Sequence, residues 1–276
     1  MHLALDLIAA AGTLILIVLG LALILGLMDV INLAHTGFMA VGVYLTVSVW
    51  QSGVNVWLAM LAGTLGAALL GAIVEWLVVR RLYGRPLDTI LATWGISLMV
   101  VQAISWAYGR GPQTLDHPLA SEVWFGYSAY RLMLLGVMAL LVLGLYAIVR
   151  FTEWGLIVRM VMANEQLAQS VGINTTRVRQ ITFVLGAALA GAAGALLGPI
   201  QSINPNYGVT VIVPAFLAVL LSGKTLSGLI VGCSILAMTQ TLFALYANPI
   251  YAVVAVIVAA VVLLRFFPEG LVWRRS

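Results

Sequence analysis

Long apolar runs, interrupted by only a few charged residues, are the feature that most constrains how this chain can fold. Nine such runs follow one another: Leu7–Leu27, Phe38–Trp50, Val56–Val79, Thr89–Tyr108, Leu132–Val149, Ile181–Ile200, Val209–Ser222, Thr225–Tyr246 and Pro249–Leu264. Most reach the roughly 20 residues with which an apolar helix crosses a bilayer. Helices satisfy their own backbone hydrogen bonds in lipid, and no run alternates as a membrane barrel strand would. The sequence therefore predicts an all-α integral membrane protein, a polytopic helical bundle of about eight or nine transmembrane segments.

The composition supports a surface that mostly faces lipid. Charged residues make up 8% of the 276 residues and hydrophobic residues 63%, whereas soluble domains carry roughly 25% charged residues. The first run has neither a basic stretch before it nor a clean cleavage site after it, so it is not expected to be a signal peptide. The single cysteine, Cys233, excludes an internal disulfide and any cysteine-based metal cluster.

The distribution of basic residues predicts how the chain is oriented. Of the 13 Lys and Arg residues, all but Arg110 and Arg131 lie in segments that can be placed together on one side of the membrane. Cytoplasmic segments are enriched in Lys and Arg, so we assign that side to the cytoplasm. The N-terminus is then expected to be external and the C-terminus cytoplasmic. An external loop is expected at about 109–130 and a cytoplasmic loop at about 151–180.

The predicted cytoplasmic loop contains a short helix at Glu165–Ser170. Asn164 is a favoured residue for capping the start of a helix, and Gly172 can end one in the left-handed conformation. A polar loop with a helix of its own can dock against another protein.

Two polar breaks predict discontinuous membrane helices. Residues 28–37 precede the short run Phe38–Trp50, and residues 201–208 precede the short run Val209–Ser222. Polar groups at membrane depth are costly and generally face a cavity or a partner, and interrupted helices mark the solute sites of many transporters. We therefore predict that both breaks line a solute pathway. The alternative is two ordinary loops at the membrane surface.

A third group of polar residues lies on the predicted fourth helix. Thr93, Ser97 and Gln102 either face the same pathway or, for Thr and Ser, bond back to carbonyls of their own helix. The candidate pathway residues are Asn32, His35, Thr36, Thr93, Ser97, Gln102, Gln201, Asn204 and Asn206.

Motifs for catalysis or nucleotide binding are missing from the sequence. Residues Ser222–Thr225 resemble the end of a P-loop, but the glycine required five places before Gly223 is replaced by Ala218. The histidines show neither the spacing of a zinc protease nor a paired nucleophile. An intramembrane enzyme is therefore a disfavoured alternative, and no metal site is expected.

A stand-alone secondary transporter or channel is a second alternative. It would require ion-coupling carboxylates deep in the membrane, for which Asp29 and Glu75 are the candidates. Because Glu75 lies five residues before Arg80, a salt bridge or extension of its side chain toward water is expected to account for it.

Residues 151–179 resemble the cytoplasmic loop of branched-chain amino-acid ABC permeases. That family has a Gly, a basic residue, an Ala followed by a polar triplet, and a closing Gly-Ile-Asn before a Gly/Ala-rich helix. The matching positions in this chain are Gly155, Arg159, Ala163, residues 164–166, residues 172–174 and residues 183–198.

Three further motifs match the family, and together with this loop they occur in the family's order along the chain. Ile31–His35 resembles its Asn-Leu-Ala-His box, and Pro268–Leu271 resembles its C-terminal Pro-x-Gly-Leu ending. Tyr83–Gly95 is similar to the urea and short-chain amide branch specifically. The chain departs from the pattern at Gly37, where the family usually has Glu, and at residues 222–228, which replace a Gly-rich turn.

The resemblance implies that residues 1–276 form a single permease domain in the bacterial cytoplasmic (inner) membrane. A second homologous permease chain would lie beside it as a heterodimer, with two ABC ATPase subunits below and a periplasmic or extracellular solute-binding protein outside. No cofactor is expected on this chain, since the partner subunits would hold ATP, and no nucleic acid is expected as a partner. The residues implied to couple to the ATPase are Arg159, Ala163, Asn164, Glu165, Ala168, Gly172 and Ile173.

The candidate pathway residues favour a small neutral or zwitterionic solute. Hydroxyl and amide groups can donate to a carbonyl and accept from an amide without burying an unpaired charge. Together with the resemblance of Tyr83–Gly95, they predict urea or a short-chain amide ahead of a branched-chain or other neutral amino acid.

Overall fold

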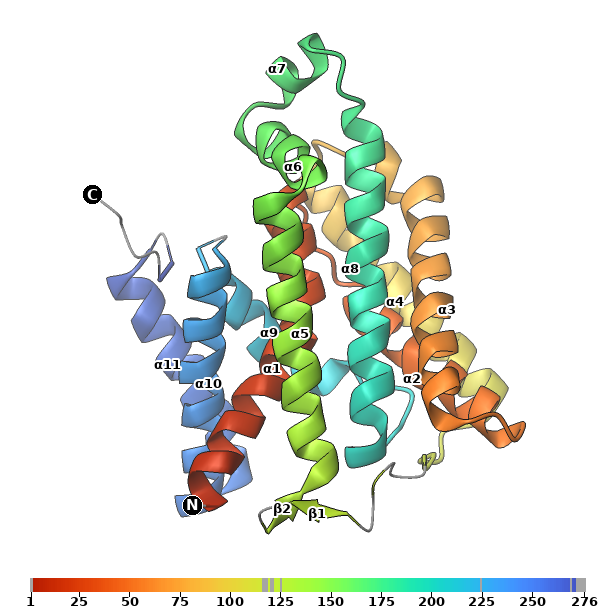
Figure 1. Cartoon of the computed structure of the whole chain (residues 1–276), viewed down its shortest axis with the longest axis vertical. Coiled ribbons are helices and arrows are strands. Elements are labelled where there is room, and N and C mark those ends of the chain that lie inside the picture. Colours follow the sequence, from red (N-terminus) through yellow and green to blue (C-terminus); the bar gives the residue numbers. More distant parts are fainter. Residues whose placement is uncertain are drawn as a thin grey trace. The chain divides into compact units, whose positions relative to one another are not determined.

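The computed structural model describes residues 2–115, 119, 122–124, 126–223, 225–268 and 270–271. The chain is almost entirely helical (Figure 1). The helices are α1 (His2–Met28), α2 (His35–Gln51), α3 (Val56–Leu77), α4 (Pro86–Tyr108), α5 (Ala129–Phe151), α6 (Glu153–Ala163), α7 (Glu165–Ser170), α8 (Thr175–Leu197), α9 (Val209–Leu221), α10 (Leu226–Tyr246) and α11 (Pro249–Phe266). Short 3-10 turns, η1 (Val79–Arg81) and η2 (Gly198–Ile200), follow α3 and α8.

Each of the nine apolar runs predicted from the sequence forms a helix, with only Val78, Ser222 and Thr225 outside the helices, which confirms the polytopic all-α fold. Within the described residues, seven helices are long and apolar enough to cross a membrane: α1, α3, α4, α5, α8, α10 and α11. The two short runs correspond to α2, with 17 residues, and α9, with 13 residues. Both are shorter than the roughly 20 residues with which an apolar helix crosses a bilayer.

The helices divide into two compact units. The first unit comprises Met1–Val18, Leu119–Ala139 and Val211–Ser276, and the second comprises Leu19–Pro118 and Leu140–Thr210. Three helices, α1, α5 and α9, contribute residues to both units.

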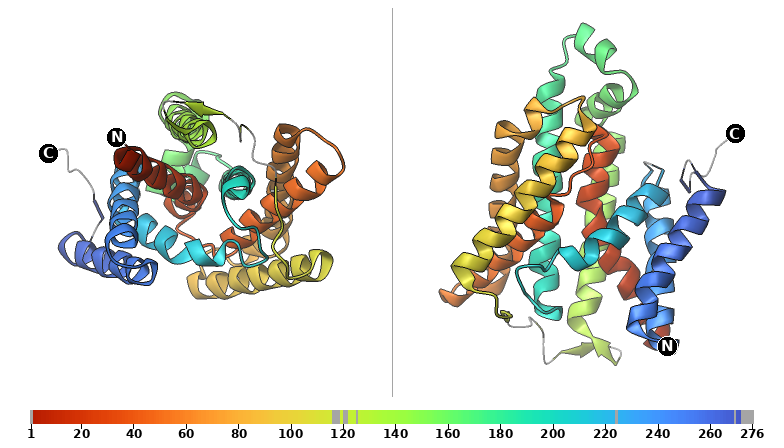
Figure 2. Two further views of the ribbon diagram at one scale, coloured as in Figure 1. Left: turned by 90° about the horizontal axis from the view of Figure 1, so that it is seen from below. Right: turned by 180° about the vertical axis from the view of Figure 1, so that it is seen from behind.

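The second unit is built around α2, α3 and α8, which pack against one another (Figure 2). Small residues allow this close approach. A methyl group at Gly42 of α2 would overlap the backbone of Gly191 on α8, and one at Gly194 would overlap the backbone of Met39. The Gly/Ala-rich face of α8 therefore brings helix backbones into direct contact, as small residues do between membrane helices.

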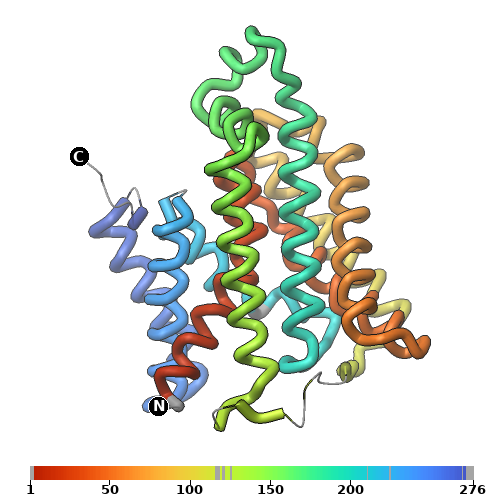
Figure 3. Tube along the Cα trace, viewed as in Figure 1, coloured from red at the N-terminus to blue at the C-terminus, as the bar shows by residue number. Residues whose placement is uncertain are grey.

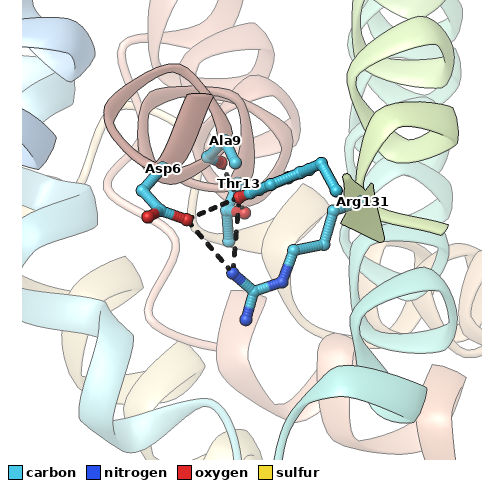
Figure 4. Close-up of polar contacts among 5 residues, drawn as sticks. Asp6, Ala9, Thr13 and Arg131 are labelled. Atoms are coloured by element: carbon cyan, nitrogen blue, oxygen red, sulfur yellow. Dashed lines mark hydrogen bonds and ion pairs between the residues drawn. The ribbon is translucent and has the colours of Figure 1, made fainter. Parts of the chain in front are cut away.

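The first unit contains the antiparallel pair α10 and α11 and the start of α1. Arg131 of α5 forms an ion pair with Asp6 of α1, with 3.7 Å between Nη1 and Oδ1 (Figure 4). Near the C-terminus, the amide of Leu271 donates to the carbonyl of Leu221 at 2.7 Å, and Gly270 packs against the backbone of Gly223. The Pro-x-Gly-Leu ending thus closes onto the turn between α9 and α10.

The segment between α4 and α5 contains a small hairpin that the sequence did not predict. Strands β1 (Val123–Trp124) and β2 (Tyr127–Ser128) pair antiparallel. Residues 116–118, which belong to the predicted external loop, lie outside the described residues.

The segment at 151–180 is largely helical (Figure 3). Helix α7 spans the predicted residues, the Asn164 side chain accepts from the amide of Leu167 at 2.9 Å, and Gly172 has a φ of 85°. Helix α6 was not predicted, and α8 begins at Thr175 rather than at Ile181. Both extend the helical content because Thr152 and Asn174 accept hydrogen bonds from the first turns of α6 and α8.

Candidate permeation site

The break between α1 and α2 lies within the second unit, and three of its residues, Val30, Asn32 and Ala34, are buried. Helix α1 ends at Met28, Asp29 adopts a left-handed φ of 54°, and α2 begins at His35. Asn32 is 0% exposed, and its Oδ1 accepts a hydrogen bond from the amide of Ala34 at 3.0 Å. The Asn side chain therefore supplies a partner that the backbone loses where the helix is interrupted.

Helix α4 provides hydroxyl groups that contact this break. The amide of Leu33 donates to Oγ1 of Thr93 at 3.1 Å, and the hydroxyls of Thr36 and Ser97 lie 2.9 Å apart. Thr93 also donates to the carbonyl of Thr89, one turn earlier in its own helix, at 2.8 Å. The two expectations for Thr93 are thus compatible, because the hydroxyl donates within α4 and accepts from the break.

The second break meets the first at Gly208. A methyl group built on Gly208 would lie 2.6 Å from Cβ and 2.7 Å from Cα of Thr36. Only a residue without a side chain allows so close an approach, and both residues are buried. The two breaks, which the sequence separates by more than 160 residues, are in contact here.

The structure brings four of the predicted residues together as the break cluster: Asn32, Thr36, Thr93 and Ser97. His35 is also buried, at the start of α2. The other candidates lie apart from these contacts. Gln102, Gln201 and Asn206 are exposed, and Asn204 is half-buried with its amide 3.5 Å from the carbonyl of Ser202.

The break cluster is polar without fixed charge. Its side chains are one carboxamide and three hydroxyls, and all are buried. The carboxamide nitrogen of Asn32 has no hydrogen-bond partner among the described residues. A buried donor without an acceptor is costly, so this N–H group is an exception among buried polar groups.

A charged network lies in the same unit, and of its members the sequence predicted Glu165 alone as a coupling residue. Glu75 of α3 is fully buried, and its Oε1 accepts from the Tyr83 hydroxyl at 2.7 Å. Arg179 of α8 lies over the Tyr83 ring, with Cζ 4.7 Å from the centroid, and pairs with Glu165 of α7. We call these four residues the α7 network.

The expected explanation for Glu75 is therefore wrong. The carboxylate neither extends to water nor pairs with Arg80 in the described contacts, because Tyr83 folds back across eight residues to donate to it. Burial, the hydrogen bond to Glu75 and the Glu75 charge raise the pKa of Tyr83, so its hydroxyl remains protonated and able to donate. In the sequence, Gly84 after Tyr83 indicates a turn that can direct the tyrosine back toward the preceding helix.

Sequence comparison identifies the family. The profile of the family described as "Branched-chain amino acid transport system / permease component" matches residues 3–265, which is nearly the whole chain. The chain belongs to this family. As a member of a permease family, it is a multi-pass membrane protein that serves transport rather than catalysis.

Individual members of the family are similar along most of their length. The high-affinity branched-chain amino acid transport system permease protein LivH of Escherichia coli is 26% identical over 287 residues, covering 97% of this chain and 93% of that protein. The probable branched-chain amino acid transport permease protein LivH of Methanocaldococcus jannaschii is 28% identical over 248 residues, covering 86% of this chain and 78% of that protein. No solved structure gives a significant match.

Proposed function

We propose that this permease is the membrane-spanning subunit of an ATP-driven importer and that a small, uncharged polar solute passes the break cluster. The observation that carries the proposal is the fully buried Asn32, whose carboxamide nitrogen has no partner within the described part of the chain. In a transporter such a donor serves a passing solute, and interrupted helices place such groups near the middle of the membrane.

Urea or a short-chain amide is the favoured solute. Its carbonyl oxygen can accept from Asn32, and its N–H groups can donate to the hydroxyl oxygens of Thr36 and Ser97. No cation is needed in the cluster, because the solute carries no charge. The similarity of Tyr83–Gly95 to the urea and amide branch supports the same solute class.

A branched-chain or other neutral amino acid is the second candidate. The relatives are named for branched-chain amino acid transport. In addition, α2 begins at His35 beside the cluster, and the positive end of its helix dipole can stabilise a carboxylate. An amino acid would also need a partner for its ammonium group, and the four side chains of the break cluster include no carboxylate.

The importer would include several partners. A second homologous permease chain would complete the pathway as a heterodimer, two ABC ATPase subunits would bind α6 and α7 on the cytoplasmic side, and a soluble receptor would deliver the solute from outside. ATP would be held by the partner subunits alone. The orientation that follows from the basic residues places the N-terminus outside and the C-terminus in the cytoplasm of a bacterium.

A stand-alone transporter or channel is the competing function. Purification of the chain from its native membrane separates the two possibilities, because an importer subunit is recovered with an ATPase subunit in a fixed ratio. Recovery of the chain without any ATPase, together with solute uptake that persists after ATP depletion, would contradict the proposed function.

Uptake by cells tests the solute site directly. Cells lacking the chain are complemented with the wild type, with Asn32→Asp, or with Asn55→Asp, and uptake of urea, short amides and leucine is measured. Asn32→Asp keeps the oxygen that accepts from Ala34 and removes the N–H donor, so the KM for an amide should rise roughly tenfold. Asn55→Asp is the charge-matched control, because Asn55 is exposed and caps α3, a position where Asp serves equally well.

The results separate the two solute classes. Restoration of urea and amide uptake, with loss in Asn32→Asp alone, supports the favoured solute. Restoration of leucine uptake without urea or amide uptake would replace it by the amino acid while leaving the permease assignment in place. An unchanged KM in Asn32→Asp for every solute would remove the break cluster from the pathway.

A further inference from the structure

Glu75 is the most deeply placed carboxylate of the α7 network. It lies on α3, one turn beyond Gly71, which packs against Ala187 of α8. The side chain is fully buried, and its second oxygen, Oε2, has no hydrogen-bond partner in the part of the chain that the structure describes. Burying a carboxylate is costly unless it is paired or hydrogen-bonded, so the Tyr83 hydroxyl is essential to its stability here.

Tyr83 connects this carboxylate to α8. Its hydroxyl donates to Glu75 while its ring lies under the Arg179 guanidinium, 4.7 Å from Cζ to the ring centroid. Arg179 in turn pairs through Nη2 with Glu165, the first residue of α7. The four side chains thus form a continuous series from the membrane helix α3 to the short helix α7.

Arg179 is the only cation in this series and serves two carboxylates. It contacts Glu165 directly and reaches Glu75 through the Tyr83 ring and hydroxyl. Its side chain is 20% exposed and that of Glu165 is 34% exposed, so the pair is only partly screened by water. A displacement of α7 that pulls Glu165 away moves Arg179 as well, and this changes the environment of Tyr83 and the hydrogen bond to Glu75.

A second contact fixes α7 to the same part of α8. The Gln169 amide donates to the Thr175 hydroxyl at 3.0 Å, and the backbone returns through Ile173, whose amide donates to the carbonyl of Ala168 at 3.0 Å. Helix α7 is therefore held at both ends, by an ion pair at its first residue and by an amide–hydroxyl hydrogen bond near its last.

We propose that Glu75, Tyr83 and Arg179 are positioning residues that transmit the displacement of α7 to the membrane helix α3. The inference rests on the proposed function, in which α7 docks an ATPase subunit. The buried carboxylate gives the series its sensitivity, because any loss of the Tyr83 donor leaves Glu75 without a hydrogen bond in a site that water does not reach. Helix α3 then has two arrangements of different energy, and the position of α7 selects between them.

A double-mutant cycle in the complete transporter tests this series. The purified importer, with its ATPase subunits and receptor, is reconstituted in vesicles, and the amount of solute transported per ATP hydrolysed is measured. Tyr83→Phe keeps the ring under Arg179 and removes only the hydroxyl, whereas Glu165→Gln weakens only the pair with Arg179. Tyr246→Phe, at an exposed position of α10, is the matched control.

The expected result is non-multiplicative. Each single variant should lower the amount of solute transported per ATP hydrolysed, the transport ratio, roughly fivefold. The double variant should have a ratio no lower than that of the more impaired single variant, because both substitutions interrupt one series. Fivefold reductions that multiply in the double variant, or single variants indistinguishable from Tyr246→Phe, would overturn the inference. A purely stabilising role would lower the amount of assembled transporter and leave the ratio per ATP unchanged.

Substitutions of Glu75 keep the test decisive if Tyr83→Phe does not assemble. Glu75→Leu removes the acceptor of the hydrogen bond from Tyr83 and should lower the transport ratio. Glu75→Gln keeps an oxygen that accepts from Tyr83, so its transport ratio should be close to that of the wild type. Equal ratios for the Leu and Gln variants would contradict a role for this hydrogen bond.

A charge exchange separates simple docking of α7 from transmission to α3. The double variant Glu165→Arg with Arg179→Glu restores an ion pair between α7 and α8 but removes the cation from the Tyr83 ring. Compared with either single charge reversal, the double variant should bind the ATPase better, but its transport ratio should remain low. Full recovery of the ratio would limit the network to the Glu165–Arg179 pair and contradict the proposed series. If the wild-type complex shows no ATP-dependent transport at all, the proposed function fails, and this inference fails with it.

Discussion

Two groups of polar side chains in the second unit differ in their burial and in their chemistry. The break cluster, made of Asn32, Thr36, Thr93 and Ser97, contains only amide and hydroxyl groups, whereas the α7 network contains two carboxylates and one guanidinium. In the break cluster the carboxamide nitrogen of Asn32 has no acceptor among the described residues. In the α7 network the Arg179 guanidinium contacts both Glu165 and the Tyr83 ring.

The difference fits the different roles proposed for the two groups. Neutral hydroxyls and amides can exchange one hydrogen-bond partner for another at little net cost, as a site that takes up and releases solute requires. A buried carboxylate cannot exchange its donor without a large penalty, so it holds one arrangement until another element moves. Variants of the break cluster should therefore change the solute dependence of transport, and variants near α7 should change its ATP dependence.

The largest effect is expected for Gly208→Ala, which attacks the contact between the two breaks. The added methyl group would lie 2.6 Å from Cβ of Thr36, so the backbone must shift and transport should fall by roughly tenfold or more. Gly37→Ala is the matched control, since its methyl would meet Ser97 Cα at an ordinary 3.4 Å. Uptake rates normalised to the amount of protein in the membrane test the pair. Equal loss in both variants would contradict a specific contact at Gly208.

A smaller but still large effect is expected for Ala168→Pro in α7. Proline removes the amide that donates to the Asn164 carbonyl at 3.0 Å and costs a helix interior about 3 kcal/mol. Transport-coupled ATP hydrolysis should fall while the KM for the solute stays the same. The charge reversal Arg159→Glu on α6 should act in the same direction. Unchanged coupling with the proline in place would rule out α7 as the docking element.

A moderate change is expected for Ser97→Ala in the break cluster. Loss of the hydroxyl that lies 2.9 Å from Thr36 removes one hydrogen bond, worth about 1 kcal/mol, and should raise the KM for solute several-fold. ATP hydrolysis without solute should not change. Ser105→Ala on the same helix is the control, because that hydroxyl donates to the Val101 carbonyl of α4. A fall in ATP hydrolysis without solute in Ser97→Ala would contradict the assignment of solute dependence to the break cluster and of ATP dependence to the α7 network.

The smallest effect on transport is expected for two single cysteines that report on sidedness. After replacement of the buried Cys233, Gln113→Cys should react with an impermeant thiol reagent added outside, and Asn174→Cys should not. Transport should remain close to normal in both. The reverse labelling would place α7 outside and separate the α7 network from any cytoplasmic ATPase.

Much of the local structure followed from the sequence. Each of the nine apolar runs forms a helix over nearly its whole length, and α7 has the predicted bounds and the predicted Asn164 cap. Within the break at residues 28–37, residues 29–34 are non-helical, whereas Met28 belongs to α1 and residues 35–37 belong to α2. These features depend on residues close together in the chain, because helix length, caps and interruptions are decided by the apolar pattern and by hydrogen bonds to neighbouring residues.

The candidate site was predicted only in part. Asn32, Thr36, Thr93 and Ser97 come together, whereas Gln102, Gln201 and Asn206 lie exposed elsewhere in the described structure. A polar residue in or beside an apolar run marks a position that needs a partner, but the pattern does not identify that partner. Glu75 shows this most clearly, since its position in the sequence favoured Arg80 and the structure pairs it with Tyr83.

The sequence by itself determined the membrane class, the nine apolar helices, the interruption after α1 and the family, because each of these follows from local composition or from a motif of adjacent residues. Only the tertiary structure decided which polar groups meet. Gly208 reaches Thr36, and Arg179 lies over Tyr83, in a unit where Gly42, Gly191 and Gly194 let α2 and α8 approach to backbone contact. Such contacts join residues far apart in the chain, and their geometry depends on the packing of whole helices rather than on any local pattern.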